Sequence, residues 1–166
     1  RAGERVAAVA VIGARAAARV ADEGLRVDRV FAPPGSVDGL AAVVGSIIVQ
    51  TERWTGERGV GRLAIIHNRR IAPGAVVPIE RMLWPVPEDE LRALALRRWP
   101  GRTVPWSRIP AETLLPIILR ERLFVRVYRA LAESLASEHA ARLMAMEAAE
   151  RNLERRDADL RAAYRR

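Results

Sequence analysis

The chain has 166 residues, of which 50% are hydrophobic and 29% charged, a composition typical of one globular domain. It contains no cysteine and no lysine, which excludes disulfide frameworks, thiolate metal sites, phosphate-loop lysines and Schiff-base chemistry. The net charge of +8 is spread along the chain with only short arginine clusters, and no long basic stripe of the kind used for single-strand binding appears, so we expect a solvated surface and no nucleic-acid partner. No apolar run approaches the roughly 18–20 residues that a membrane-spanning helix needs.

The first elements alternate between strand and helix. Residues 6–12, VAAVAVI, form a continuous apolar run that predicts a strand buried on both faces of a parallel sheet. A secretory signal peptide is the alternative for this start, but the acidic residue at position 4 and the early return of arginines favour a strand and a helix. Residues 14–23 then predict a helix stopped by Gly24, and residues 27–32 predict a second strand.

A longer helix is predicted next. Ser36 is a candidate N-cap, and the helix should end near Gly56–Gly59. Its apolar face consists of Leu40, Val43, Val44, Ile47 and Ile48.

Two more strands complete the predicted sheet. Residues 62–68 form a third strand, and residues 75–83 form a fourth after a turn at Pro73–Gly74. The alternation of strands and helices predicts an α/β fold, with a Rossmann-like, partly parallel sheet in a domain of residues 1–110. The end of this domain, residues 85–110, is rich in proline and tryptophan and has room for a short helix at 88–98.

Residues 111–166 predict one long helix that forms a second domain. From Glu112 onward the chain carries only one proline, Pro116, and no glycine, so about 50 residues could extend for about 75 Å. A heptad row along it is almost entirely apolar: Ile118, Val125, Ala132, His139, Met146, Leu153 and Leu160. A second heptad row along the same helix is only partly apolar, because it includes Arg142 and Arg156. Such a narrow seam predicts one partner helix, as in half of an antiparallel coiled coil.

The usual sequence signals of catalysis are weak. Gly13 follows a strand, but GARAAA lacks the further glycines of a dinucleotide-binding turn, so we expect a simple strand-to-helix turn. His67 has no acidic neighbour in the sequence and is expected to be a structural hydrogen-bonding residue. His139, beside Glu138, lacks the spacing of a metal site. We therefore predict no catalytic, cofactor-binding or metal-binding residues.

Two methionines, Met144 and Met146, could form an adaptable recognition surface, but we expect them to pack in the helix seam. Glu138 and Arg142 are four residues apart and predict an ordinary ion pair on the helix surface.

Residues 133–149, ESLASEHAARLMAMEAA, resemble the start of the long C-terminal helix of the gamma subunit of rotary F-type ATP synthases. The residues that match the family pattern are Glu133, Ser134, Ala136, Ser137, Glu138, Ala141, Arg142, Ala145, Met146 and Ala149. Leu143 stands where the family usually has methionine, and Asn152 matches a following asparagine.

The resemblance continues more weakly upstream and also shows departures. LAIIHNRRIAPGAVVPIERMLWPVP and IPAETLLPIILRERLFVRVYRALAES resemble the segments that lead into this helix, and VAVIGARAAARV resembles the family's second strand. His67 replaces a usual tyrosine, and Arg15 and Ala16 depart from a basic-glycine turn, which is compatible with a divergent or paralogous member. The family's N-terminal helix, first strand and C-terminal Ile-Thr-x-Glu-Leu segment have no counterpart, so we expect a fragment or processed chain.

The resemblance implies a rotor subunit of a proton-translocating ATP synthase that is not an enzyme by itself. Its implied partners are the epsilon subunit, the membrane c-ring, the alpha/beta catalytic hexamer and the missing N-terminal helix. Its implied place is the cytoplasmic face of a bacterial inner membrane, as a peripheral subunit. The residues expected at partner interfaces are Trp106, Arg108, Glu133, Ser137, Glu138, Arg142, Met146 and Asn152.

Two other functions stay open at this point. One is a small Rossmann-like nucleotide-binding enzyme with a helical tail, and the other is a basic adaptor or nucleic-acid-binding protein that dimerises through the helix. If one helix of the shaft is missing, the distal helix, about residues 145–166, should fray or pair with another copy.

Overall fold

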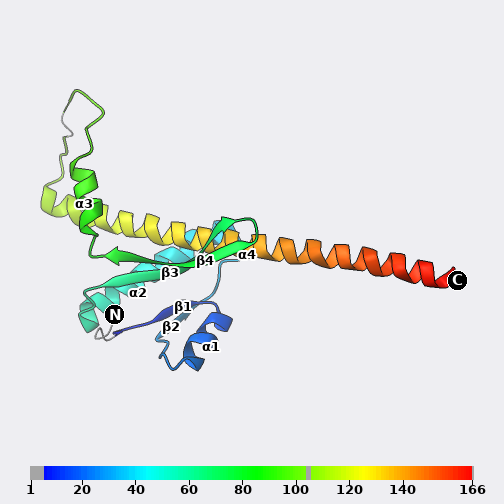
Figure 1. Cartoon of the computed structure of the whole chain (residues 1–166). Helices are drawn as coiled ribbons and strands as arrows, with labels where there is room; N and C mark the ends of the chain where they lie inside the picture. Colours follow the sequence, from blue (N-terminus) through cyan, green and yellow to red (C-terminus); the bar gives the residue numbers. More distant parts are fainter. Residues whose placement is uncertain (1–5, 104–105, 166) are drawn as a thin grey trace. The chain divides into compact units, whose positions relative to one another are not determined.

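A computed structural model describes residues 6–103 and 106–165 of the chain (Figure 1). It divides into two compact units. The first is formed from the described parts of Arg1–Ile65 and Glu80–Arg129, and the second from Ile66–Ile79 and the described part of Ala130–Arg166.

The first unit begins with a parallel strand–helix–strand motif. Strand β1 (Ala10–Ile12) pairs in parallel with β2 (Arg29–Phe31), with Val11 opposite Val30, and helix α1 (Ala14–Asp22) connects them. A parallel pair needs such a crossover, because a tight turn can join only antiparallel strands. The predicted strand–helix–strand order is confirmed.

The expectation of a long strand buried on both faces was wrong. β1 spans only Ala10–Ile12, and none of its residues is buried. The reason is that, in the part of the chain that the structure describes, its sheet has only two strands, which leaves much of each face uncovered. The first five residues of the predicted signal-peptide alternative lie outside the described residues.

Helix α2 (Leu40–Arg58) supplies much of the buried apolar surface. Leu40, Val44 and Ile48 on its predicted face are at most 2% exposed, while Val43 and Ile47 are partly exposed. The predicted Ser36 cap was wrong. A short 3₁₀ helix η1 (Val37–Gly39) precedes α2, and the Ser36 side chain makes no capping hydrogen bond.

Strands β3 (Leu63–Ala72) and β4 (Ala75–Trp84) form a second two-stranded sheet. The two-residue turn at Pro73–Gly74 joins them as an antiparallel hairpin. Both strands extend beyond the predicted ranges, and the described strands divide into two pairs instead of one continuous sheet. Leu83 on β4 is 3% exposed and belongs to the core.

Helix α3 (Glu88–Ala95) is shorter than predicted, and helix α4 (Ala111–Tyr164) is 54 residues long. At 1.5 Å per residue α4 extends for about 80 Å. Pro116 lies inside its second turn and cannot donate a backbone hydrogen bond to the preceding turn. The predicted mixed α/β fold with a long C-terminal helix is thereby confirmed. In residues 6–103 and 106–165, no helix has an apolar stretch long enough to cross a bilayer.

Candidate functional site

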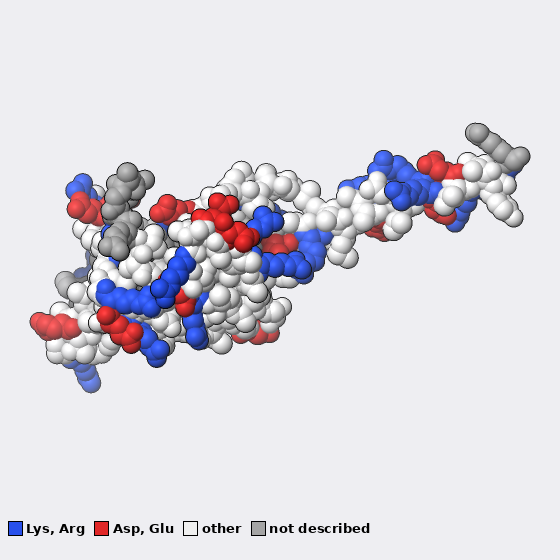
Figure 2. Space-filling model, turned by 90° about the horizontal axis from the view of Figure 1, so that it is seen from below, with Lys and Arg blue, Asp and Glu red and all other residues white. Residues whose placement is uncertain are grey.

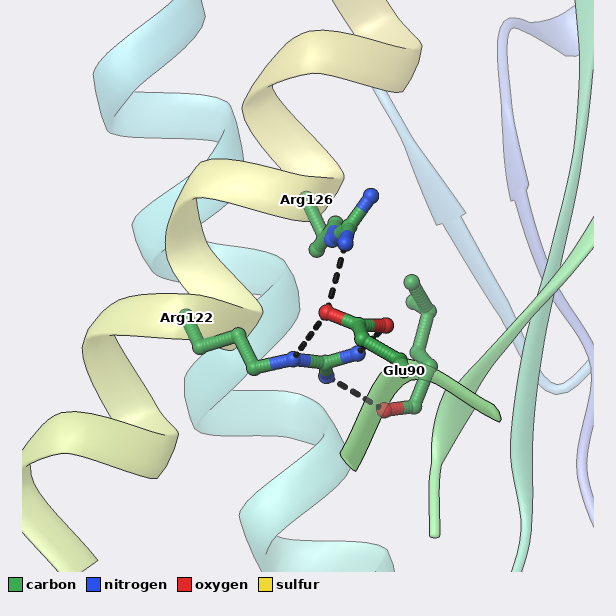
Figure 3. Close-up of polar contacts among 4 residues, drawn as sticks. Glu90, Arg122 and Arg126 are labelled. Atoms are coloured by element: carbon green, nitrogen blue, oxygen red, sulfur yellow. Dashed lines mark hydrogen bonds and ion pairs between the residues drawn. The ribbon is translucent and has the colours of Figure 1, made fainter. Parts of the chain in front are cut away.

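The candidate site is helix α4 itself, together with the side chains that hold its first half. In the first unit Glu90 of α3 accepts hydrogen bonds from two arginines of α4 (Figure 3). Arg122 Nη2 lies 2.6 Å from Glu90 Oε2, and Arg126 Nη2 lies 2.6 Å from Glu90 Oε1. Arg122 Nη1 also donates to the Leu83 carbonyl at 3.1 Å. One carboxylate thus links α3 to two successive turns of α4, and Arg122 adds a link to β4.

These contacts also set the charge state of the carboxylate. The pKa of Glu90 is lowered from its ordinary value of 4.5, chiefly by the hydrogen bond from Arg122, and partial burial opposes this shift. The Glu90 side chain is 26% exposed and that of Arg122 is 17% exposed, so the pair is only partly screened by water. A further ion pair joins Arg120 Nε to Glu52 Oε1 of α2 at 2.7 Å.

In the second unit the hairpin lies against α4. His67 Nε2 lies 2.9 Å from Glu133 Oε2, and because a carboxylate only accepts, Nε2 carries the proton in this pair. The Asn68 backbone N–H donates to Ser134 Oγ at 3.0 Å, and Ser137 Oγ donates to the Glu133 carbonyl at 2.7 Å. The structural role predicted for His67 is confirmed, with an acid that is distant in sequence.

The turn of the hairpin reaches further along the same helix. Gly74 has a φ of +76°, and a Cβ atom there would lie 2.9 Å from Met144 Cε. The positive φ therefore favours glycine at this position, whereas the flexible end of the Met144 side chain could move away from a Cβ atom. Met144 thus contacts the hairpin turn, and its packing in a seam with a partner helix stays a prediction.

Beyond Met144 the helix is exposed. Met146, Leu153 and Leu160 of the predicted seam are 64%, 67% and 70% exposed. Figure 2 shows basic and acidic side chains interspersed along this distal part. The ion pairs there have i, i+4 spacing, with Arg161 and Asp157 at 2.9 Å and Arg151 and Glu147 at 3.9 Å. Such pairs support a helix locally and require no packing partner.

The structure separates the residues predicted for partner interfaces into two groups. Glu133 is engaged with His67, and Ser137 is 2% exposed, so both make contacts within the second unit. The others are exposed: Trp106, Arg108, Glu138, Arg142, Met146 and Asn152. Glu138 and Arg142 form the predicted surface pair at 2.6 Å, and Asn152 Oδ1 accepts a hydrogen bond from Arg155.

The contact of Glu90 with Arg122 and Arg126 was not predicted from the sequence. The four-residue spacing of the two arginines on α4 was a visible signal, but charged residues at this spacing usually face solvent. Nothing in the sequence indicates that an acid more than 30 residues earlier lies between them.

Gly13 precedes α1 with a φ of +94°, which explains glycine at a strand-to-helix turn without any ligand. Within the part of the chain that is described, no group of three or more His, Asp or Glu side chains is placed to hold a metal ion. The arrangement positions and stiffens a long helix.

Comparison with known proteins agrees with this architecture. The family model described as ATP synthase matches residues 1–166. The ATP synthase gamma chain of Salinibacter ruber is 34% identical over 143 aligned residues, covering 80% of this chain and 46% of that protein. The gamma chain of Nitrosomonas eutropha is 28% identical over 155 aligned residues, covering 90% of this chain and 51% of that protein. This chain thus spans about half the length of these relatives.

A solved structure matches in fold. A chain in the cryo-EM structure of the central stalk and c-ring of Tetrahymena thermophila mitochondrial ATP synthase superposes with a TM-score of 0.54 and 18% identity. The match covers 84% of this chain and 58% of that one. The family match over the whole sequence establishes that the chain belongs to the ATP synthase family, and within that family it is similar to gamma chains.

Proposed function

We propose that this chain works as a rotor element, which couples rotation of a membrane ring to conformational change at catalytic sites on other subunits. It contributes no catalytic residue of its own in this proposal, and the assembled complex makes or hydrolyses ATP. The observation that carries the proposal is α4, a continuous helix of 54 residues whose distal part exposes a narrow apolar row. A shaft that turns against other subunits must be stiff along its length and must carry its own helix stability.

In this proposal residues 1–110 form the foot and residues 111–166 form one helix of the shaft. The foot would dock on the c-ring and the epsilon subunit, and the distal helix would enter the alpha/beta hexamer. The exposed row at Met146, Leu153 and Leu160 would pack against an N-terminal helix of the kind found in the family. The complex would lie on the cytoplasmic face of a bacterial inner membrane and couple to protons.

The residues predicted for partner interfaces take two roles in this proposal. The exposed ones on α4 would contact other helices or subunits directly: Glu138, Arg142, Met146 and Asn152. Glu133 would act indirectly, because its contact with His67 fixes the hairpin against the helix. Ser137 would support Glu133 from within the helix, because its Oγ donates to the Glu133 carbonyl. Trp106 and Arg108 would belong to the membrane-side surface of the foot.

Site-specific crosslinking tests the proposal, and the absence of cysteine makes it simple. A Leu160→Cys variant carrying a photo-crosslinker is mixed with an α3β3 hexamer from a related ATP synthase, together with that enzyme's N-terminal gamma helix. We expect crosslinks to the hexamer subunits and a rise in the ATPase activity of the hexamer. An Arg19→Cys variant with the same crosslinker on the exposed side of α1 is the matched control and should not crosslink to the hexamer.

Equal crosslinking from positions 19 and 160, or none from position 160, would contradict the rotor function. A change in ATPase activity without any crosslink from position 160 would contradict the placement of α4 as the shaft.

A further inference from the structure

The segment between α3 and α4 has an unusual combination of side chains. We call residues 96–103 and 106–110 the Arg/Trp segment. It contains Arg97, Arg98, Arg102 and Arg108, and the sequence has no acidic residue between Glu90 and Glu112. In Figure 1 the segment projects away from α3 and from the start of α4. Its described residues form no helix or strand.

The large apolar side chains of this segment face solvent. Trp99 is 59% exposed, Trp106 is 78% exposed and Leu96 is 84% exposed. Trp54, in contrast, is 7% exposed within the same unit. Large exposed apolar side chains gathered in one segment are costly in water and usually mark a binding surface.

The arginines of the segment are not neutralised. Among residues 6–103 and 106–165, no carboxylate lies within ion-pair distance of Arg97, Arg98 or Arg102. The Arg108 guanidinium lies over the Trp106 ring, 5.8 Å from its centroid. Arginines on distal α4 differ, because Arg142, Arg151 and Arg161 each pair with a carboxylate one turn away.

Local packing holds one of the indoles at the surface. A Cβ atom on Gly101 would lie 3.2 Å from Trp99 Nε1, so the indole lies against the backbone of its own turn. The ring is therefore supported by the segment and still exposes more than half of its surface.

We propose that the Arg/Trp segment binds the surface of an anionic phospholipid bilayer. Guanidinium groups pair with phosphate oxygens in a bidentate way, and indole rings favour the boundary between headgroups and acyl chains. An irregular segment can place both kinds of side chain on a fluid surface without a complementary groove. An acidic protein loop is the competing partner, but it would leave the exposed indoles without an apolar environment.

The inference goes beyond the proposed rotor function, because it concerns lipid and needs no other subunit. A chain that activates the hexamer but does not bind vesicles would contradict the lipid inference alone. Vesicle binding without crosslinking to the hexamer would contradict the rotor function alone.

Vesicle co-sedimentation of the 166-residue chain tests the inference. Vesicles of phosphatidylcholine with about 30 mol% phosphatidylglycerol, which is roughly physiological in charge, are compared with vesicles of pure phosphatidylcholine. We expect at least about tenfold tighter binding to the anionic vesicles, reduced by salt. The tryptophan fluorescence should shift to shorter wavelength on binding.

Variants locate the contact. Arg97→Gln with Arg98→Gln should weaken binding to anionic vesicles by about 30-fold, because each basic residue contributes about 1 kcal/mol of attraction to the surface. Arg155→Gln with Arg156→Gln removes the same charge from distal α4 and should retain binding within about twofold of that of the unchanged chain. Trp99→Phe with Trp106→Phe should abolish the fluorescence shift, because Trp54 and Trp84 lie outside the segment.

Further outcomes would also overturn the inference. They are equal affinity for the two kinds of vesicle, an equal loss in the two arginine variants, and a fluorescence shift that persists without Trp99 and Trp106. If the chain binds neither kind of vesicle but binds an acidic peptide through Arg97 and Arg98, the partner of the segment is a protein instead.

Discussion

The first and last parts of α4 are stabilised in different ways. Val127 and Leu131 are 1% and 6% exposed, and arginines on the same stretch bond to Glu90 and to the Leu83 carbonyl. Leu153 and Leu160 are 67% and 70% exposed, and the polar contacts around them are local pairs within the helix. The first part is therefore held by tertiary packing, and the last part depends on intrinsic helix propensity.

This difference has a consequence for the distal helix. Alanine, arginine, glutamate and leucine all favour helix, and i, i+4 ion pairs add a few tenths of a kcal/mol each. A helix held in this way opens locally at a lower free energy than one that is buried in a core. In the proposed rotor function, this contrast would suit a shaft whose distal part becomes packed only when a partner helix binds.

A matched pair of leucine substitutions should give the largest effect. Leu131→Ala removes a buried side chain and should lower the free energy of unfolding by about 2–4 kcal/mol. Leu153→Ala, on the same helix, should change it by no more than about 0.5 kcal/mol. Urea denaturation followed by circular dichroism measures both. Similar costs for the two variants would mean that the distal helix is packed in solution.

Hydrogen exchange measures the same contrast without a mutation. Amides of residues 122–137 should exchange at least about tenfold more slowly than those of residues 150–164, because only the former lie beside buried side chains. Mass spectrometry on peptic fragments gives the comparison. If a monomer is fully protected from exchange up to residue 160, the distal helix is as stable as the buried part and the contrast is contradicted. Protection that rises with protein concentration would show that two copies pair.

Removal of the Glu90 carboxylate should have a smaller effect. Glu90→Gln loses charge-assisted hydrogen bonds from Arg122 and Arg126 and should cost about 1–2 kcal/mol of unfolding free energy. Glu138→Gln removes an exposed partner of Arg142 and is the matched control, with an expected cost below about 0.5 kcal/mol. Thermal melts and urea titrations measure both variants. An equal cost would show that Glu90 is no more important than a surface pair.

Acidification should remove the advantage of Glu90 gradually. Its pKa is lower in the folded chain than the ordinary value of 4.5, so the unfolded chain takes up the proton first as the pH falls. The stabilisation is complete above about pH 5.5 and is lost as the pH falls below 4.5 and through the folded pKa. The stability difference between the unchanged chain and Glu90→Gln should therefore shrink between pH 6 and pH 3. A difference that grows on acidification would contradict the assignment.

Much of the fold could be predicted from local patterns. The long α4 followed from the absence of glycine and the strong helix formers after Glu112, and the hairpin turn followed from Pro73–Gly74. The boundaries of β1 could not be predicted, because VAAVAVI has the composition of a buried strand while burial depends on neighbouring strands. The Ser36 cap failed because η1 intervenes before α2.

The residues of the candidate site likewise fall into those that could be selected from the sequence and those whose contacts could not be predicted. The exposed residues Glu138, Arg142 and Asn152 could be selected because their sequence pattern is local to one helix. The partners of Glu90, His67 and Gly74 could not be found, since each contact joins residues more than 30 positions apart.

The sequence by itself determined the long helix, its heptad row and the family, because helix propensity, side-chain periodicity and residue motifs are properties of a continuous stretch of chain. Only the tertiary structure decided which part of that helix is buried and which carboxylate accepts hydrogen bonds from Arg122 and Arg126. It also decided that the Met144 side chain lies beside the glycine of the hairpin turn. Such contacts depend on where distant segments meet in space, which no local pattern of residues encodes.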